Sequence, residues 1–158
     1  MRDLVKTTVS AMLKTGMLHH VSLPISNIDT ARSFYEGVLG LEEDKSRPAF
    51  DFDGAWYKLG DRRLHLIVPK SEDHPTFRSD KAVDSHDAHF AIRVPSFSGA
   101  IAYLESKGFR KTTDLNPRPT SEDPRPMRVN AAGKAGFPQI YILDPDRNVI
   151  EVNAERED

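Results

Sequence analysis

Hydrophobic and polar residues alternate in several short segments of the chain, as is typical of strands that bury one face. The alternation is clearest in residues 20–25, HVSLPI, and in residues 89–94, HFAIRV. Less regular apolar segments, separated by turn residues, predict further strands. We expect these at residues 50–59, 63–68, 127–130, 137–143 and 148–153.

Each of the two clearest strands is followed by a segment with helical spacing. Residues 31–39 carry apolar side chains at positions i, i+3, i+4, i+7 and i+8, and Gly40 follows as a helix-ending residue. Residues 97–104 carry a similar stripe that Gly108 ends. Both segments therefore predict helices. The residues able to cap them at the N-terminus are Ser26, Asn27, Asp29 and Ser96.

The order of strand, helix and further strands occurs twice, with nearly the same distance from the strand histidine to the helix-ending glycine. This repeat predicts an α+β fold made of two related modules. We place the modules at residues 18–68 and 87–154, joined by a linker at 69–86, within a single domain at 18–154. We expect residues 1–17 to be an N-terminal tail or extension.

Composition narrows the classes of function. A net charge of −2 over 158 residues argues against nucleic acid as a partner, because phosphate binding needs a basic surface. No run approaches the roughly 18 apolar residues of a membrane span, and residues 1–17 lack the apolar core of a secretory signal. We expect a cytoplasmic protein. Since the chain has no cysteine, any metal must be bound by imidazole and carboxylate groups.

Strand alternation places four potential metal ligands on the face opposite the helices. In the first strand the apolar residues face the helix, which leaves His20 on the other side. The same reasoning places His65, His89 and Glu151 on the non-helix face of their strands. Three imidazoles and one carboxylate suit Zn, Ni, Co or Fe(II), and Mn less well. The sequence therefore predicts one divalent metal site.

Other charged residues have more than one interpretation. Arg63 and Arg93 share the face of the four candidate ligands, where they could bind a substrate carboxylate or act as outer charges in salt bridges. The acidic residues 42–44 are expected to form an exposed turn. His74 and His86 lie in the linker and are expected to be solvated.

Four segments resemble a known superfamily: HHVSLPISNIDTARSFYEGVLGL, RLHLI, HFAIRV and DPDRNVIEV. Together they extend over about residues 18–154 and resemble the vicinal oxygen chelate proteins, which include glyoxalase I, fosfomycin-resistance enzymes, methylmalonyl-CoA epimerase, extradiol dioxygenases and bleomycin-resistance proteins. The resemblance implies two βαβββ modules that form a curved mixed sheet cup. It assigns the metal to His20, His65, His89 and Glu151. At His65 the chain departs from glyoxalase I, which usually has Glu or Gln there.

The resemblance also implies a function, a metal-dependent lyase or isomerase of glyoxalase I type. The metal would hold two neighbouring oxygens of a small thiol-adduct or acyl substrate and stabilise an ene-diolate. Glu151 would be both a ligand and the general base. Two alternatives remain, an Fe(II)-dependent dioxygenase and a non-catalytic protein that binds a small molecule such as an antibiotic. We also expect a homodimer, with the ligands gathered either within one chain or across two.

Overall fold

The computed structural model describes residues 16–71, 73–74, 80–132 and 134–158. The predicted tail at 1–17 therefore lies almost entirely outside the described residues. The first half contains β1 (His20–Pro24), α1 (Ile28–Tyr35), β2 (Gly54–Leu59) and β3 (Arg62–Ile67). The second half contains β4 (His89–Arg93), α2 (Phe97–Ser106), β5 (Arg110–Thr112), β6 (Pro126–Asn130), β7 (Gln139–Leu143) and β8 (Val149–Asn153).

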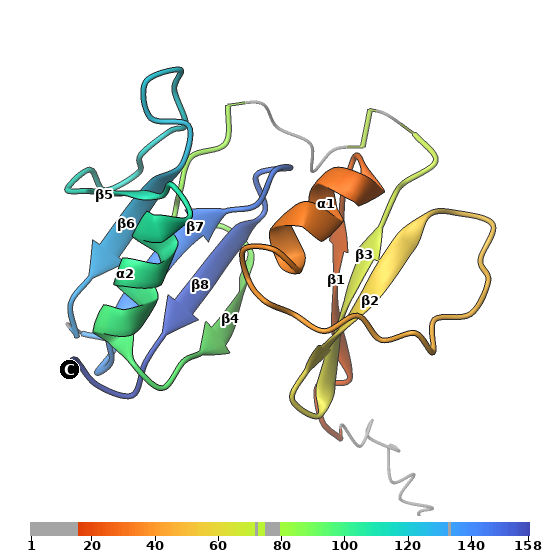
Figure 1. The fold of residues 1–158 in the computed structure, drawn as a ribbon, viewed down its shortest axis with the longest axis horizontal. Coiled ribbons are helices and arrows are strands. Elements are labelled where there is room, and N and C mark those ends of the chain that lie inside the picture. Colours follow the sequence, from red (N-terminus) through yellow and green to blue (C-terminus); the bar gives the residue numbers. More distant parts are fainter. Residues whose placement is uncertain (1–15, 72, 75–79, 133) are drawn as a thin grey trace, which may run out of the picture.

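The strands form two mixed sheets, and this arrangement confirms the predicted α+β fold class (Figure 1). The first sheet has the order β1-β3-β2 and the second the order β4-β8-β7-β6-β5. In each half, the strand that precedes the helix pairs in parallel with the last strand of that half. The last strand also pairs antiparallel with the strand before it. The two halves therefore repeat one another in topology.

The repeat is incomplete at the outer edge of each sheet. Glu43 makes an isolated antiparallel bridge to Tyr57, in the place that the full strand β6 takes beside β7 in the second half. The second sheet also gains β5, which was not predicted. Its three residues, RKT, have no apolar alternation that could have indicated a strand.

Strand β2 begins at Gly54, whereas the sequence predicted a start at residue 50. The backbone of Gly54 lies against β3, and a Cβ atom there would come within 2.3 Å of the carbonyl oxygen of Leu66. Glycine is needed for this close approach. The aromatic residues Phe50 and Phe52 precede the strand and stack on each other, with ring centroids 5.0 Å apart. Their apolar character therefore does not reflect pairing in the sheet.

Both helices begin at predicted caps. The side chain of Asn27 accepts a 2.9 Å hydrogen bond from the Thr30 amide, and Ser96 accepts one of 2.9 Å from the Gly99 amide. The α-helix α1 ends at Tyr35, earlier than the predicted end at Gly40. The chain continues in hydrogen-bonded turns, so Val38 still joins the buried stripe that suggested a longer helix.

The two halves share one hydrophobic core. Phe34 and Tyr35 of α1 belong to the same buried cluster as Phe97 and Leu104 of α2. Polar contacts also join the halves, since the amide of Asn148 donates a 3.0 Å hydrogen bond to the carbonyl oxygen of Pro24 in β1. In Figure 1 both helices lie on the same side of the molecule.

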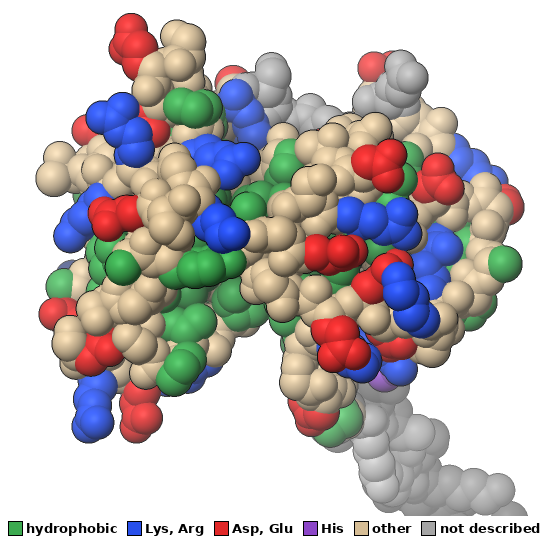
Figure 2. Space-filling model, in the orientation of Figure 1, with side chains coloured by type: hydrophobic (Ala, Val, Ile, Leu, Met, Phe, Trp, Pro, Cys, Tyr) green, Lys and Arg blue, Asp and Glu red, His purple; other side chains and the backbone are tan. Residues whose placement is uncertain are grey.

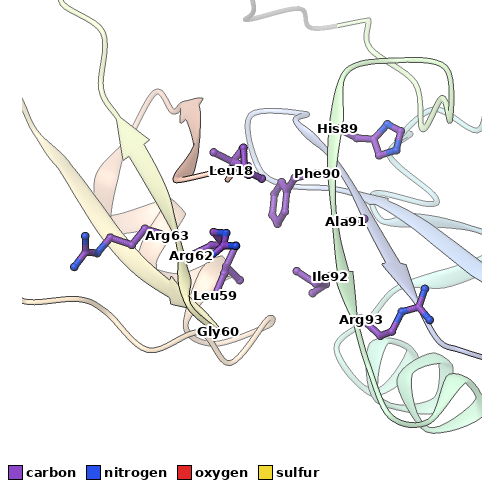
Figure 3. A pocket seen from close by; sticks show the side chains of 11 residues that line it. Leu18, Leu59, Gly60, Arg62, Arg63, His89, Phe90, Ala91, Ile92 and Arg93 are labelled. Atoms are coloured by element: carbon purple, nitrogen blue, oxygen red, sulfur yellow. The ribbon is translucent and has the colours of Figure 1, made fainter. Parts of the chain in front are cut away.

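Among the described strands, β1 and β4 each pair with one neighbour, so each has one edge that no other described strand covers. Between these two strands lies a pocket of about 450 Å³ (Figure 3). Leu18 and Leu59 of the first half and Phe90 and Ile92 of the second half line it. Among the described residues, no helix has the length and apolar character that crossing a membrane requires.

Candidate metal centre

The first sheet carries a row of three stacked rings on the face away from α1. His65 of β3 lies between His20 of β1 and Trp56 of β2, and both of its ring-centroid distances are 4.2 Å. Leu64 and Leu66, the neighbours of His65 in β3, are fully buried on the opposite face. Alternation along β3 therefore places His65 on the face that the sequence predicted.

His65 is a neutral imidazole, and one of its ring nitrogens lacks a hydrogen-bond partner among the described residues. Burial, together with the nearby His20 and Arg63, lowers the pKa of His65 to about 4. Its Nε2 atom is buried and makes no hydrogen bond within the described part of the chain. A buried polar atom without a hydrogen-bond partner destabilises the fold, and binding a ligand would offset this cost. This nitrogen has the properties of a metal ligand.

His20 has one ring nitrogen engaged by its neighbour in sequence. The Nδ1 atoms of His19 and His20 lie 2.8 Å apart, which allows one of them to donate a hydrogen bond to the other. The Nε2 atom of His20 is then the nitrogen left to bind a ligand. His20 and His65 together form the first pair of candidate metal ligands.

The second pair lies on neighbouring strands of the other sheet. Nε2 of His89 in β4 is 3.3 Å from Oε2 of Glu151 in β8. The Nδ1 atom of His89 lies 2.7 Å from the carbonyl oxygen of Asp87, which can only accept a hydrogen bond. In the neutral ring, Nδ1 therefore carries the proton and Nε2 presents a lone pair to the carboxylate. Two lone pairs at this distance repel each other unless a proton or a metal ion lies between them.

Glu151 is held in place by neighbouring polar groups. Its side chain is buried, with Oε1 accepting a 2.6 Å hydrogen bond from Asn153 and Oε2 a 2.9 Å bond from the Tyr141 hydroxyl. Burial raises the pKa of Glu151, but hydrogen bonds from Asn153, Tyr141 and Gln139 outweigh this effect and leave the pKa below its usual value. Burial and the bond to Glu151 raise the pKa of Tyr141 to about 12. Glu151 is therefore ionised at neutral pH, and Tyr141 is its donor.

One chain does not bring the two pairs together. Among the described residues, no group of three or more His, Asp or Glu side chains is placed to hold a metal ion. In Figure 3, Arg63 points to one side of the pocket, while His89 and Arg93 point to the opposite side. The ligand-bearing faces of the two sheets therefore diverge. The face that carries the helices shows scarcely any histidine side chain among the described residues (Figure 2).

The two arginines on these faces have different partners. Nε of Arg63 lies 2.6 Å from Oδ2 of Asp44, and its guanidinium group lies 5.6 Å from the centre of the Trp56 ring. Nε of Arg93 donates a 2.9 Å hydrogen bond to Oδ1 of Asn153. Arg63 thus already has a carboxylate partner, whereas Arg93 contacts a neutral amide.

Asp44 corrects one sequence prediction. The acidic residues 42–44 were expected to be exposed, but Asp44 is buried beneath the Arg63 contact. Hydrogen bonds from Ser46 and Arg63 lower the pKa of Asp44 to about 2. A carboxylate with such partners can be buried as an ion. Outside the site, the side chain of His86 is 88% exposed, as predicted, while His74 is half-buried.

Sequence reasoning did not single out Tyr141 or Asn153, although both hold Glu151. Tyr141 pairs directly with Glu151 across β7 and β8, and Asn153 lies two residues further along β8. The strand pattern could have placed both residues beside Glu151, because residues with this register share one face of a sheet. The sequence gives no reason, however, to prefer these two over other polar residues on that face.

The amino-acid sequence matches the family model of the Glyoxalase/Bleomycin resistance protein/Dioxygenase superfamily over residues 17–152. The mitochondrial methylmalonyl-CoA epimerase of Mus musculus is 30% identical over 152 residues, which make up 93% of this chain and 76% of that protein. The epimerase of Bos taurus is also 30% identical, over 146 residues that cover 89% of this chain and 74% of that protein.

Solved structures of glyoxalase proteins share the fold. A glyoxalase family protein of Bacillus anthracis superposes with a TM-score of 0.63 at 20% identity, covering 91% of this chain and 98% of that one. Lactoylglutathione lyase of Agrobacterium tumefaciens superposes with a TM-score of 0.56 at 19% identity, covering 89% and 94%. The family match extends over most of the sequence and agrees with the repeated strand–helix modules. The chain therefore belongs to the glyoxalase, bleomycin resistance protein and dioxygenase superfamily.

Proposed function

We propose that this protein is a metal-dependent enzyme of glyoxalase I type, a lyase or isomerase that moves a proton at a carbon next to a carbonyl group. The observation that carries the proposal is the pair formed by His89 and Glu151. In the neutral His89 ring, Nδ1–H donates a hydrogen bond to the carbonyl oxygen of Asp87. The facing atoms of His89 and Glu151, 3.3 Å apart, then both present lone pairs. A divalent cation between them would remove the repulsion. The buried, unpartnered Nε2 of His65 supports the same conclusion for the first sheet.

The site is proposed to form between two copies of the chain. His20 and His65 lie on one sheet and His89 and Glu151 on the other, and no described group of three such side chains is placed to hold a metal. The first pair of one copy would meet the second pair of another, giving two identical sites in a homodimer. The edges of β1 and β4 that no other described strand covers support this arrangement, because exposed edges favour pairing or cover.

Different residues of the chain would have different roles in the reaction. A bound divalent metal would act as a Lewis acid on the substrate oxygens. Glu151 would remove the proton from carbon, since it is ionised and its Oε2 faces His89, where the metal would bind. Hydrogen bonds from Asn153 and Tyr141 hold its carboxylate in position. Arg93, on the same side of β4 as His89, is available to bind a carboxylate of the substrate (Figure 3).

Similarity to the methylmalonyl-CoA epimerases favours acyl thioesters as the first substrates to test. A proton next to a thioester carbonyl is acidic enough for general-base removal, and delivery of a proton to the opposite face of the resulting enolate would invert that carbon. Hemithioacetals are the alternative class, in which the same proton moves to the neighbouring carbon. Both reactions begin when a base removes a proton beside a chelated pair of oxygens, and this step fits the proposed role of Glu151.

The dioxygenase and binding-protein alternatives fit the site less well. An Fe(II) dioxygenase needs three protein ligands and open positions for both substrate and oxygen. The unpartnered nitrogen of His65 favours a fourth ligand, which leaves two positions in an octahedron for a chelating substrate. A protein that only sequesters a small molecule needs no such ligand set.

Metal analysis and isotope exchange together test the proposal. We expect about one divalent metal per chain in purified protein. In deuterium oxide, we expect turnover of an acyl thioester or hemithioacetal to place deuterium on the carbon next to the carbonyl. Protein that stays metal-free in the presence of Zn²⁺, Co²⁺, Ni²⁺ and Mn²⁺ would contradict the proposal. Oxygen consumption with a catechol would instead favour the dioxygenase function.

A further inference from the structure

Both oxygens of the Glu151 carboxylate are held by uncharged donors. Asn153 donates from its amide to Oε1 at 2.6 Å, and Tyr141 donates from its hydroxyl to Oε2 at 2.9 Å. All three side chains are buried. A carboxylate can otherwise rotate about its terminal bond. Here the two donors fix which oxygen faces His89.

A second contact extends this network to the edge strand β4. Arg93 and Asn153 are register partners across β4 and β8, and Nε of Arg93 donates a 2.9 Å hydrogen bond to Oδ1 of Asn153. The guanidinium group also lies 5.1 Å from the centre of the Phe137 ring. Because the amide oxygen of Asn153 is bound by Arg93, its NH₂ group must face Glu151. Arg93 thus acts on Glu151 through Asn153.

Tyr141 also contacts the other member of the ligand pair. Its ring meets the His89 ring edge-on, with centroids 5.6 Å apart and an interplanar angle of 84°. Its hydroxyl and its ring therefore restrict Glu151 and His89 respectively. The carbonyl oxygen of Asp87 also restricts the His89 ring, because it accepts a hydrogen bond from Nδ1.

We propose that Tyr141, Asn153 and Arg93 are positioning residues that hold Glu151 in the geometry needed to bind a metal together with His89. This inference rests on the proposed function, since it assumes that the pair binds a metal. Groups that orient metal ligands commonly contribute about 10- to 100-fold to metal affinity. We expect this effect on metal affinity in the absence of substrate. A role of Arg93 in substrate recognition alone would not change metal affinity under that condition.

The test measures Co²⁺ affinity of the full-length protein by competition with a chelator, in the absence of substrate. Tyr141→Phe removes only the hydroxyl, and Arg93→Lys keeps the charge but loses the planar group that engages Asn153. Tyr57→Phe is the matched control, because the Tyr57 hydroxyl donates a hydrogen bond of the same 2.9 Å length to Glu36, and neither residue belongs to the site. Thermal unfolding checks that each variant folds.

We expect Tyr141→Phe and Arg93→Lys each to weaken Co²⁺ binding by about 10- to 100-fold, and Tyr57→Phe to leave it within about twofold of wild type. The visible absorption of bound Co²⁺ should also change in the two site variants, because it reports ligand geometry. Wild-type affinity in both folded site variants would overturn the positioning role and leave the proposed function intact. A wild-type protein that binds no metal would overturn the proposed function, and the positioning role with it.

Discussion

The hydroxyl group of Tyr35 donates a 2.7 Å hydrogen bond to Oδ2 of the buried Asp144, and this bond joins the two halves of the molecule. Asn148 donates to the same carboxylate from its backbone at 2.7 Å and from its side chain at 2.8 Å. A buried carboxylate needs such donors. The contact between the halves therefore depends on a polar network as well as on the shared core.

Tyr35→Phe should lower the free energy of unfolding by about 1.5–3 kcal/mol, because it removes a hydrogen bond to a buried charged group. Denaturant unfolding at pH 7 measures the loss. Tyr103→Phe is the control, since the Tyr103 side chain lies on the surface and is 45% exposed. Equal stability of the Tyr35→Phe variant and the wild type would show that the contact contributes nothing measurable.

Asp144→Asn should change how stability depends on pH. Burial raises the pKa of Asp144 to about 6, from an ordinary value of 3.8, so the folded protein binds this proton more tightly than the unfolded chain. The contribution of Asp144 to stability is therefore greatest at low pH and declines as pH rises from about 4 to about 6. The difference in unfolding free energy between wild type and variant should show this decline and be flat above pH 7. A pH-independent difference would contradict the assignment.

Alanine substitutions should reveal the metal ligands. We expect His20→Ala, His89→Ala and Glu151→Ala each to reduce metal occupancy sharply, because each removes a ligand. His86→Ala should leave occupancy unchanged, since that side chain is 88% exposed and lies outside the proposed site. Elemental analysis after dialysis gives the occupancy. Full occupancy in the three ligand variants would show that the metal site has been placed wrongly.

Mixing inactive variants tests whether each site is shared between two copies. A heterodimer of His20→Ala and Glu151→Ala would contain one site with both substitutions and one site with neither. After subunit exchange, random pairing should restore about a quarter of wild-type activity. A mixture of His20→Ala and His65→Ala is the matched control, because every site then lacks one histidine. Equal activity in the two mixtures would exclude a shared site.

Glu151→Gln should separate metal binding from catalysis. Glutamine keeps the shape and a weak oxygen ligand but cannot accept a proton from carbon. We expect it to retain substantial metal and to lose turnover by about 10²- to 10⁴-fold. Deuterium exchange on a confirmed substrate measures the loss. Near wild-type exchange by the variant would exclude Glu151 as the base.

Strand alternation predicted the face of His65 because neighbouring leucines fix the side on which it lies. Alternation acts within a strand, however, and does not give the orientation of one sheet relative to the other. The sequence therefore left open whether the two ligand pairs meet in one chain. Asp44 could not be predicted as buried, because its burial depends on Arg63, 19 residues away. Family resemblance added the ligand set, but not the hydrogen bonds around Glu151.

The stacked row of rings on the first sheet also provides an optical probe. Trp56 is the only tryptophan in the sequence, and its indole lies nearly parallel to the His65 imidazole at a centroid distance of 4.2 Å. Any change on that imidazole alters the immediate surroundings of the sole strongly emitting side chain. The intrinsic fluorescence of the unlabelled protein should therefore respond directly to events at His65, with no other indole to obscure the signal.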